Sequence, residues 1–390
     1  MTIRALSVFG TRPEAIKMAP LVRRLARDAR FDAQVCVTAQ HREMLDSALA
    51  LFEIEPEHDL NVMAPGQDLF DVTTKVLNGM RTVLRRERPD VVLVHGDTTS
   101  CLAASMAAFY ERIPIAHVEA GLRSGDLAAP FPEEFNRIVA DCVARWRFAP
   151  TPGARDNLLA TGASPSSIFV VGNTVIDALQ WVRARIDGRS ARDYASAFGA
   201  ELAAQLDAWR GRVVLVTGHR RENFGAPFEE LCRAIREAAA VHDDWLFVYP
   251  THLNPNVQRP VRTILADAPN VALCAPCDYE PFVWLMNRCD VILTDSGGVQ
   301  EEGPALAKPV LVMRDVTERP EAIAAGTARL VGAHRERIVS SLEELLGSES
   351  AYRAMASARN PYGDGNSSER IVELLAEHVP SSTALLAASA

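Results

Sequence analysis

The chain has 390 residues, of which 48% are hydrophobic, and its formal net charge is −9 at pH 7. A chain of this length and composition can bury the cores of two or three globular domains. Its acidic balance argues against a surface that binds nucleic-acid phosphates. It has no run of about 18 apolar residues and no apolar signal segment at its start, so we expect a cytoplasmic protein that binds no membrane.

Short apolar runs alternate with helical patterns along the chain, which indicates parallel sheets covered by helices. In the first half, strands are predicted at Ala5–Phe9, Gln34–Thr38, Val91–His95, Ile113–Val118 and Trp146–Ala149. In the second half, strands are predicted at Val213–Thr217, Trp245–Tyr249, Val271–Leu273, Val291–Thr294 and Pro309–Met313. The sequence therefore predicts an α/β protein with two doubly wound, Rossmann-like domains, whose ligand loops follow the strands and enclose a cleft.

The domain boundary is predicted near Gly172 and Asn173, where a short apolar run ends and Thr174 can cap a following helix. We expect an N-terminal domain over residues 1–172 and a C-terminal domain over residues 173–365. Residues 187–212 contain no strand candidate and are an alternative connecting region. After the turn-rich NPYGDGN, a helix over about 366–380 is expected to pack back on the first domain.

The seven cysteines are an odd number scattered through a large chain, which does not indicate a disulfide framework. Cys274 and Cys277 form a CxxC pair. A zinc site would need a second pair of ligands, and only Cys289 follows nearby; a redox pair would normally lie at the start of a helix. We interpret the spacing as coincidental and expect no metal site.

The first predicted strand ends in Gly10, before a helix that starts near Pro13. A glycine turn before a helix lets backbone N–H groups face an anion, and Arg12 and Lys17 would add positive charge beside it. The alternative is an ordinary turn with two solvated cations. The GxGxxG pattern of dinucleotide-binding folds is absent.

Acidic residues follow two strands that we expect to be neighbours. Asp97 comes after VVLVHG and Glu119 after the run from Ile113 to Val118, while Glu133 lies in the next loop. Carboxylates that share one site raise the pKa of at least one of them, so one can act as an acid and another as a base. Alternatively, Asp97 only caps the following helix.

In the second half, His219 follows a strand and a glycine, a position suited to proton transfer or to phosphate binding. A core or capping histidine is the alternative, and His252 has a similar position. The strongest phosphate signal is the turn from Ser296 to Gly298, because adjacent glycines let the backbone approach a pyrophosphate at a helix start. A tight turn without a ligand is the alternative. Glu302 would accept ribose hydroxyls, and Arg319 would close over the anion.

Together these motifs resemble those of the non-hydrolysing UDP-N-acetylglucosamine 2-epimerases, bacterial enzymes with the two-domain GT-B-type fold and an active site in the interdomain cleft. The matching strings extend from residue 3 to about residue 375. In chain order they are FGTRPEAIKMAP, TAQHREMLD, VLVHGDTTS, HVEAGLRSGDL, PFPEEFNR, TGHRRENFG, YPTHLNPN, LTDSGGVQEEGP, RDVTERPEA and NPYGDG.

The resemblance implies reversible inversion at carbon 2 of UDP-N-acetylglucosamine, giving UDP-N-acetylmannosamine for cell-surface polysaccharides. The family eliminates UDP to form 2-acetamidoglucal and then adds it back, without NAD, a metal or any other cofactor. A homodimer is the family expectation. The alternatives are an epimerase for a modified UDP-sugar, a GT-B glycosyltransferase that uses a UDP-sugar, a hydrolysing epimerase and a non-catalytic nucleotide-sugar sensor.

The resemblance also implies roles for individual residues. The acid/base and leaving-group residues would be Asp97, Glu119, Glu133 and His219. The UDP-binding residues would be Arg12, Lys17, Phe282, Ser296, Gly297, Gly298, Glu302 and Arg319, with Phe282 near the uracil. An activating second UDP-sugar would use Gln40, His41, Glu134, Arg220 and His252. Two positions depart from the family pattern: Glu43 replaces a glutamine typical of members with the second site, and Cys277 replaces a glutamine expected near the uracil.

Overall fold

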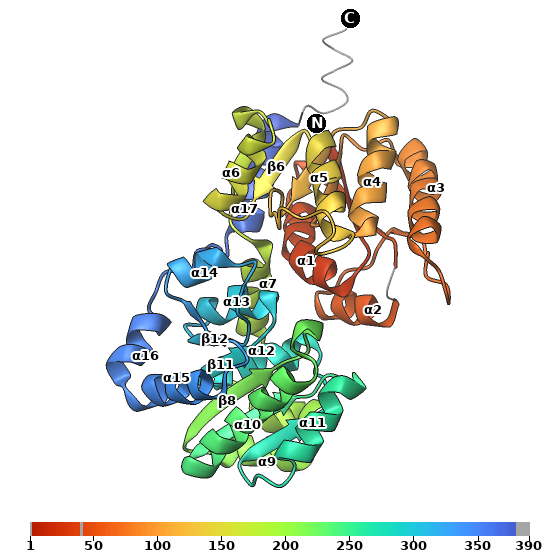
Figure 1. Cartoon of the computed structure of the whole chain (residues 1–390). Helices are drawn as coiled ribbons and strands as arrows, with labels where there is room; N and C mark the ends of the chain where they lie inside the picture. Colours follow the sequence, from red (N-terminus) through yellow and green to blue (C-terminus); the bar gives the residue numbers. More distant parts are fainter. Residues whose placement is uncertain (1, 40–41, 380–390) are drawn as a thin grey trace, which may run out of the picture. The chain divides into compact units, whose positions relative to one another are not determined.

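The computed structural model describes residues 2–39 and 42–379. Their contacts divide them into two compact units, which are described one at a time (Figure 1). The first unit comprises residues 2–39, 42–178 and 362–379, and the second comprises residues 179–361. The chain leaves the first unit after Ala178, inside helix α7 (Thr174–Arg185), rather than after residue 172, and it returns at Tyr362.

In the described part of the first unit, seven parallel strands form one sheet in the order β3-β2-β1-β4-β5-β6-β7. The strands are β1 (Ile3–Phe9), β2 (Phe31–Val37), β3 (His58–Asp59), β4 (Val91–His95), β5 (Ile115–Val118), β6 (Trp146–Ala149) and β7 (Ile168–Val170). Strand β1 pairs with β2 on one side and with β4 on the other. The strand order therefore reverses between β1 and β4, the switch point at which doubly wound sheets bind ligands.

The helices of the first unit cover this sheet. They are α1 (Arg12–Arg27), α2 (Arg42–Leu51), α3 (Leu69–Glu87), α4 (Thr99–Tyr110), α5 (Glu133–Val143), α6 (Pro152–Ala160), the short 3₁₀ helix η1 (Pro165–Ser167) and α17 (Ser367–His378). Helix α17 packs against α1. Its first turn is capped by Asp177, whose carboxylate accepts hydrogen bonds from the backbone N–H groups of Ser367 (3.2 Å) and Ser368 (2.7 Å).

The described second unit repeats this plan with six parallel strands in the order β10-β9-β8-β11-β12-β13. The strands are β8 (Arg212–Thr217), β9 (Trp245–Pro250), β10 (Val271–Cys274), β11 (Val291–Thr294), β12 (Val310–Val312) and β13 (Ala328–Leu330). Strand β8 pairs with both β9 and β11, so the switch point of this sheet lies between β8 and β11.

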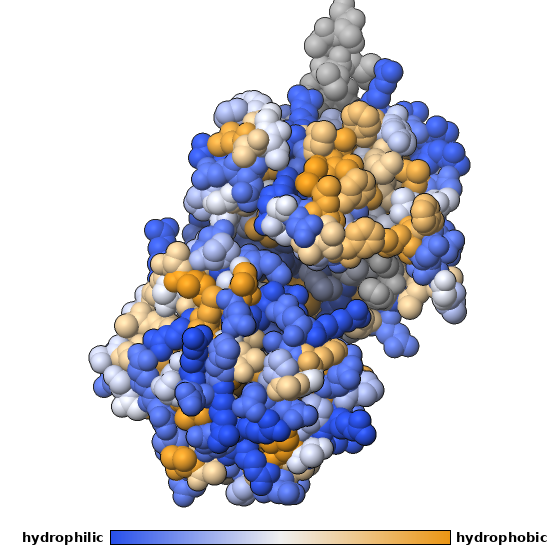
Figure 2. All heavy atoms as spheres, viewed as in Figure 1, coloured by the Kyte–Doolittle hydropathy of each residue, from blue (hydrophilic) through white to orange (hydrophobic). Residues whose placement is uncertain are grey.

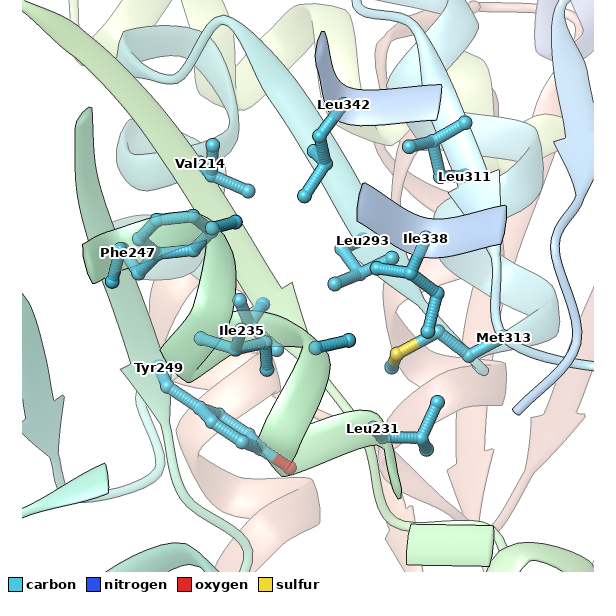
Figure 3. Close-up of a cluster of buried hydrophobic side chains, with 14 of the residues drawn as sticks. Val214, Leu231, Ile235, Phe247, Tyr249, Leu293, Leu311, Met313, Ile338 and Leu342 are labelled. Atoms are coloured by element: carbon cyan, nitrogen blue, oxygen red, sulfur yellow. The ribbon is translucent and has the colours of Figure 1, made fainter. Parts of the chain in front are cut away.

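The helices of the second unit enclose its core. They are α8 (Ala195–Phe198), α9 (Ala200–Ala208), α10 (Ala226–Val241), α11 (Pro255–Leu265), α12 (Tyr279–Arg288), α13 (Gly297–Ala305), α14 (Pro320–Ala324), α15 (Arg335–Gly347) and α16 (Glu349–Ala356), with 3₁₀ helices η2 (Ala191–Tyr194) and η3 (Arg221–Asn223). Figure 3 shows Phe247 and Leu293 of the sheet facing Ile235 of α10 and Ile338 of α15. These side chains are fully buried, and this packing fixes the strands whose ends carry the predicted ligand loops.

The predicted fold class, two doubly wound α/β domains, is confirmed. The ten predicted strands correspond to β1, β2, β4, β5, β6 and β8–β12, with ends that differ by a few residues. Strands β3, β7 and β13, of two or three residues each, were not predicted. Among the described residues, no helix is both long and apolar enough to cross a membrane.

Candidate functional site

A buried carboxylate ties together the two loops at the switch point of the first unit. Glu14, in the first turn of α1, accepts hydrogen bonds from the backbone N–H groups of Gly10 (3.0 Å) and Thr11 (2.8 Å) after β1. The hydroxyl of Thr98, after β4, donates to its other oxygen at 2.6 Å. Burial raises the pKa of Glu14, although these hydrogen bonds oppose the shift. In the loop that was predicted to bind an anion, the N–H groups of Gly10 and Thr11 therefore donate to the protein's own Glu14 carboxylate.

Asp97 does not cap helix α4. The cap is Thr98, whose hydroxyl accepts a hydrogen bond from the backbone N–H of Cys101 at 3.1 Å. The Asp97 carboxylate instead pairs with the guanidinium group of Arg137 on α5. Its backbone carbonyl accepts a hydrogen bond from the Asn136 side chain at 2.8 Å. The side chain of Asp97 is therefore oriented from α5 and remains about one-third exposed, at 31%.

Glu119 follows β5 and is buried, with a backbone φ of 62° that a residue with a side chain rarely adopts. Its carboxylate pairs with Lys17 of α1 and accepts a hydrogen bond from the side-chain amide of Asn173 at 2.9 Å. Arg137 donates to the Glu119 backbone carbonyl at 2.6 Å and lies 3.9 Å from its carboxylate. His95, the last residue of β4, lies 3.8 Å from the same carboxylate. Four side chains from separate parts of the chain therefore surround the carboxylate of Glu119.

The two carboxylates meet at one cation, because Arg137 contacts both Asp97 and Glu119. Burial alone would raise the pKa of Glu119, but the neighbouring side chains of Lys17, His95 and Arg137 hold this pKa well below its ordinary value. The sequence argument predicted a raised pKa for at least one of the two acids, and Glu119 is not that acid. Lys17 is the largest cause of the lowering, and Arg137, which the sequence argument did not single out, adds to it.

Glu133 and Glu134 begin helix α5. Glu133 lies one turn before Arg137, on the same face of the helix. One of its carboxylate oxygens is buried and has no hydrogen-bond partner among the described residues. Glu134 is buried and accepts hydrogen bonds from the backbone N–H groups of Ser124 (3.0 Å) and Gly125 (3.2 Å). Glu134 therefore fastens the loop that precedes the helix.

The remaining predicted residues of the first unit lie close to these acids or outside the described chain. Arg12 is the first residue of α1 and is partly buried. Lys17 contacts Glu119, so in this structure its charge faces a protein carboxylate. Gln40 and His41 lie outside the described residues.

A buried histidine and aspartate support the loop that carries Glu119. The Nδ1 atom of His117 lies 2.6 Å from the Asp141 carboxylate, and its Nε2 atom lies 2.8 Å from the carbonyl of Gly96. Asp141 also accepts hydrogen bonds from the N–H of Gly121 (3.2 Å) and from Arg123 (2.6 Å). Burial would raise the pKa of Asp141, but His117 and Arg123 lower it. The sequence argument missed these contacts, although HVEAGLR contains three of the residues that make them: His117, Gly121 and Arg123.

The second switch point is also closed by a buried carboxylate. Asp295, after β11, accepts hydrogen bonds at 2.8 Å from the backbone N–H groups of His219 and Arg220, after β8. The His219 ring is 40% exposed, so it is not a core histidine, and its Nδ1 atom lies 3.4 Å from Asp295. Burial lowers the pKa of His219, although Asp295 opposes the shift. The ring stacks on His252 with a centroid distance of 5.5 Å.

The glycine turn after Asp295 starts helix α13. Ser296 is the residue before the helix, and Gly297 is its first residue. A side chain added at Gly297 would point toward two guanidinium groups, with 3.7 Å to Arg220 and 3.8 Å to Arg319. Arg319 is itself held by an ion pair with the buried Glu301. Backbone N–H groups and two arginines therefore surround this helix start, an arrangement that favours an anion.

Glu302 lies one turn into α13 and is buried. It accepts a hydrogen bond of 2.5 Å from the hydroxyl of Tyr279, the first residue of α12, which the sequence argument did not single out. Phe282 lies on the same helix and is partly buried. Cys274 ends β10 and Cys277 precedes α12, and both thiols are free. Within residues 2–39 and 42–379, no three His, Cys, Asp or Glu side chains are arranged to hold a metal ion.

Comparison with known proteins identifies the family. The sequence profile of UDP-N-acetylglucosamine 2-epimerase matches residues 23–376. The UDP-N-acetylglucosamine 2-epimerase of Escherichia coli strain K12 is 56% identical over 376 residues, which cover 96% of this chain and 98% of that protein. This chain belongs to the UDP-N-acetylglucosamine 2-epimerase family.

Solved structures of this epimerase family share the fold. The UDP-GlcNAc 2-epimerase from Neisseria meningitidis bound to UDP-GlcNAc has 45% identity and a TM-score of 0.85, and the match covers 96% of this chain and all of that chain. The enzyme from Methanocaldococcus jannaschii in complex with UDP-GlcNAc and UDP has 32% identity and a TM-score of 0.77, with the same coverage. The two Rossmann-like units of this chain are therefore those of the GT-B-type epimerases.

Proposed function

We propose that this enzyme, an isomerase, interconverts UDP-N-acetylglucosamine and UDP-N-acetylmannosamine by inversion at carbon 2 of the sugar. Its family supports the reaction, and so does the named activity of the relative that is 56% identical to it. The observation that carries the proposal is the arrangement of Asp97 and Glu119 around one arginine at the switch point of the first sheet. Two acids in one site can work on the two faces of a sugar carbon.

The proposed path runs through elimination. The bond between sugar carbon 1 and the UDP oxygen breaks, the electron pair leaves with UDP, and a carboxylate takes the proton of carbon 2. The products are UDP and 2-acetamidoglucal. A proton then adds to the opposite face of carbon 2, UDP adds back to carbon 1, and the epimer results. The substrate and the product contain the same atoms at the same oxidation state, so the reaction needs no oxidant. We propose that the enzyme needs no cofactor or metal.

We assign the proton transfers to Asp97, Glu119 and Glu133. Ionised carboxylates are the form that a general base requires, and the lowered pKa of Glu119 supports this role. Glu133 would share the site through its position one turn before Arg137, with a buried carboxylate oxygen that lacks a partner among the described residues. His219 would stabilise the departing diphosphate or transfer a proton.

We assign UDP binding to the loops of the second switch point together with Arg12 and Lys17. The start of α13 at Ser296, Gly297 and Gly298, with the guanidinium group of Arg319, would hold the diphosphate. Glu302, oriented by Tyr279, would accept the ribose hydroxyls. Phe282 would lie near the uracil, where Cys277 replaces the expected glutamine.

A second, activating UDP-sugar is a further proposal for this family member. It would use Gln40, His41, Glu134, Arg220 and His252. The stacking of His252 on His219 supports a link between such a ligand and the proposed leaving-group residue. Glu43 in place of the glutamine typical of activated members argues that the response to a second UDP-sugar is weak.

We also propose that the enzyme is a cytoplasmic homodimer that supplies cell-surface polysaccharide synthesis. Hydrophobic residues gather over α4 and α5 in Figure 2, and the exposed large side chains there include Phe109, Tyr110 and Phe135. Exposed apolar surface of this kind favours burial against a second protein. Light scattering of the purified protein tests the dimer, which a charged substitution at Phe135 should weaken.

Proton NMR of the enzyme with UDP-N-acetylglucosamine in deuterium oxide tests the activity. We expect UDP-N-acetylmannosamine with deuterium at carbon 2, formed equally well in excess EDTA. Free N-acetylmannosamine with UDP would instead identify a hydrolysing enzyme. If no mannosamine isomer forms but sugar is transferred once an acceptor is added, the enzyme is a glycosyltransferase.

A further inference from the structure

Asn173 is a buried side chain that contacts Glu119 from the start of α7, the helix in which the chain leaves the first unit. It is only 2% exposed. Its backbone N–H donates to the carbonyl of Tyr362, the residue at which the chain returns, at 2.7 Å. The outgoing and returning passages approach so closely that a Cβ atom at Gly172 would lie 2.7 Å from the Ser367 hydroxyl. The backbone of Asn173 is therefore fixed between the two passages.

The contacts of this side chain decide which end of its amide faces Glu119. The side-chain oxygen accepts a hydrogen bond from the backbone N–H of Val175 at 3.0 Å and so caps the first turn of α7. A backbone N–H only donates, so the end of the amide that faces it must be the oxygen. The NH₂ group then donates to the Glu119 carboxylate at 2.9 Å. A donor at this position stabilises the ionised carboxylate more than the neutral acid.

Side chains of other elements also face the Glu119 carboxylate. Burial raises the pKa of this carboxyl group, whereas Lys17 of α1, His95 of β4 and Arg137 of α5 hold it well below its ordinary value. Two of these groups have a second task, because Arg137 also pairs with Asp97 and Lys17 is among the residues that we assign to UDP. The amide carries no charge that a diphosphate would attract, so its hydrogen bond to the acid does not compete with UDP.

We propose that Asn173 is a positioning residue whose amide N–H holds the Glu119 carboxylate in place, in its ionised form, to take the proton from sugar carbon 2. This rests on the proposed role of Glu119 as an acid/base group. The backbone of Glu119 has a φ of 62°, and Arg137 donates to its carbonyl at 2.6 Å. The backbone of the acid is thus held from α5 and its carboxylate from the start of α7. The proton moves to Glu119, and the amide neither gains nor loses one.

Two substitutions remove the donor and keep a cap on α7, because Asp and Ser are both favoured at this position of a helix. In Asn173→Asp a carboxylate oxygen replaces the amide nitrogen, so two like charges face each other. In Asn173→Ser a neutral but shorter hydroxyl remains. Asn270→Asp is the matched control. Asn270 is also a buried amide, but it lies in the second unit and donates to the backbone carbonyls of Ala239, His242 and Trp245.

We expect Asn173→Asp to lower kcat at pH 7 by about 10-fold or more and to leave UDP affinity within about twofold, because the loss falls on proton transfer. The added negative charge raises the pKa of Glu119, so the acid limb of the kcat profile moves to higher pH. Asn173→Ser should move this limb in the same direction by less, because only a donor is lost. Asn270→Asp should lower the melting temperature and leave the acid limb where it is.

A second readout does not depend on activity. Thermal unfolding at pH 7 compares the effect of Asn173→Asp in the wild type and in Glu119→Gln. In the wild type the new carboxylate faces Glu119, and the melting temperature should fall. In Glu119→Gln the amide introduced at position 119 donates to the new carboxylate, so the loss should be much smaller.

An equal loss of melting temperature in both backgrounds would overturn the proposal. So would near-normal turnover of Asn173→Asp, or an acid limb that neither Asn173 variant moves. If the wild type forms no mannosamine isomer, the proposed function fails, while the thermal comparison still decides whether Asn173 donates to an ionised Glu119.

Discussion

The two units have sheets of the same strand order, and each closes its switch point with a buried carboxylate, yet they surround that carboxylate differently. In the first unit Glu14 ties the loops, and the nearby acids Asp97 and Glu119 are each paired with cations. In the second unit Asp295 ties the loops, and the arginines Arg220 and Arg319 face the start of α13. One fold thus presents carboxylates at one switch point and positive charge at the other.

The difference predicts a division of work between the two sites. Carboxylates paired with cations suit proton transfer, because their protonation state is set by fixed charges. A helix start with two guanidinium groups suits a diphosphate, because its backbone N–H groups and the two cations favour an anion. Substitutions of Asp97 and Glu119 should therefore change turnover, and substitutions at the start of α13 should change UDP affinity.

The largest effect is expected at Glu119. Replacing it with glutamine removes the group that accepts a proton but keeps its size, so kcat should fall on the order of 10²-fold or more. UDP affinity, measured by calorimetric titration, should stay within about twofold. Native circular dichroism is the control for folding. The comparison fails if Glu119→Gln loses UDP binding as severely as it loses turnover, or retains near-normal turnover.

Glu14 tests the carboxylate that closes the first switch point. In Glu14→Gln an amide NH₂ replaces one of the two oxygens that accept hydrogen bonds from Gly10, Thr11 and Thr98, which should cost about 1–3 kcal/mol in unfolding free energy at pH 4. The folded-state pKa of Glu14 is raised, so its contribution to stability is full below the unfolded-state pKa and is lost as pH rises through the folded-state value. Glutamine does not titrate.

The gap in melting temperature between wild type and Glu14→Gln should therefore narrow as the pH is raised from 4 to 8. Scanning calorimetry at several pH values measures it. A gap that widens with pH would show that Glu14 is stabilised in its ionised form, contrary to the direction given by its burial.

The positions of the site loops could be predicted from the sequence, whereas their electrostatics could not. Asp97, Glu119, His219 and Ser296 each follow a recognisable apolar strand, and strands of a parallel sheet end at one edge. Within each sheet the strand order decides which loops are neighbours, and the sequence predicted this only for the strands before Asp97 and Glu119, which pair as β4 and β5.

The direction of the Glu119 pKa shift depended on contacts that no local pattern encodes. Lys17 lies 102 positions away in the chain and Asn173 lies 54 positions away. Arg137 was visible in the sequence, but its position between two carboxylates depends on how α5 packs on the sheet. The short strands β3, β7 and β13 were missed for a related reason, since sheet neighbours rather than their own residues define them.

Gly297 tests the anion site of the second unit. A Cβ atom there would lie 3.7 Å or more from its neighbours, so we expect Gly297→Val to fold, with circular dichroism as the check. It would, however, stand between the helix start and a phosphate, and UDP affinity should fall by about tenfold or more, equivalent to about 1.4 kcal/mol. Gly303→Ala on the same helix is the contrast, because its side chain would lie 2.6 Å from Val310. That variant should lose stability, and a normal UDP affinity in Gly297→Val would remove the diphosphate from this turn.

The smallest effect is expected at Tyr279. Its hydroxyl donates a 2.5 Å hydrogen bond to Glu302, and we propose that this bond orients the carboxylate toward the ribose. Tyr279→Phe should therefore weaken UDP binding by about threefold, within the range of about 0.5–1.5 kcal/mol for one hydrogen bond, and leave kcat at saturating substrate nearly unchanged.

Tyr352→Phe is the matched control, because its hydroxyl donates at 3.1 Å to the backbone carbonyl of Asp290, away from the loops of the second switch point. Calorimetric titration with UDP and with uracil separates the ribose contribution, since uracil lacks the sugar. A loss of affinity for uracil equal to that for UDP would place the effect of Tyr279 on the base rather than on the ribose, and an equal loss of UDP affinity in Tyr352→Phe would show a general loosening of the second unit.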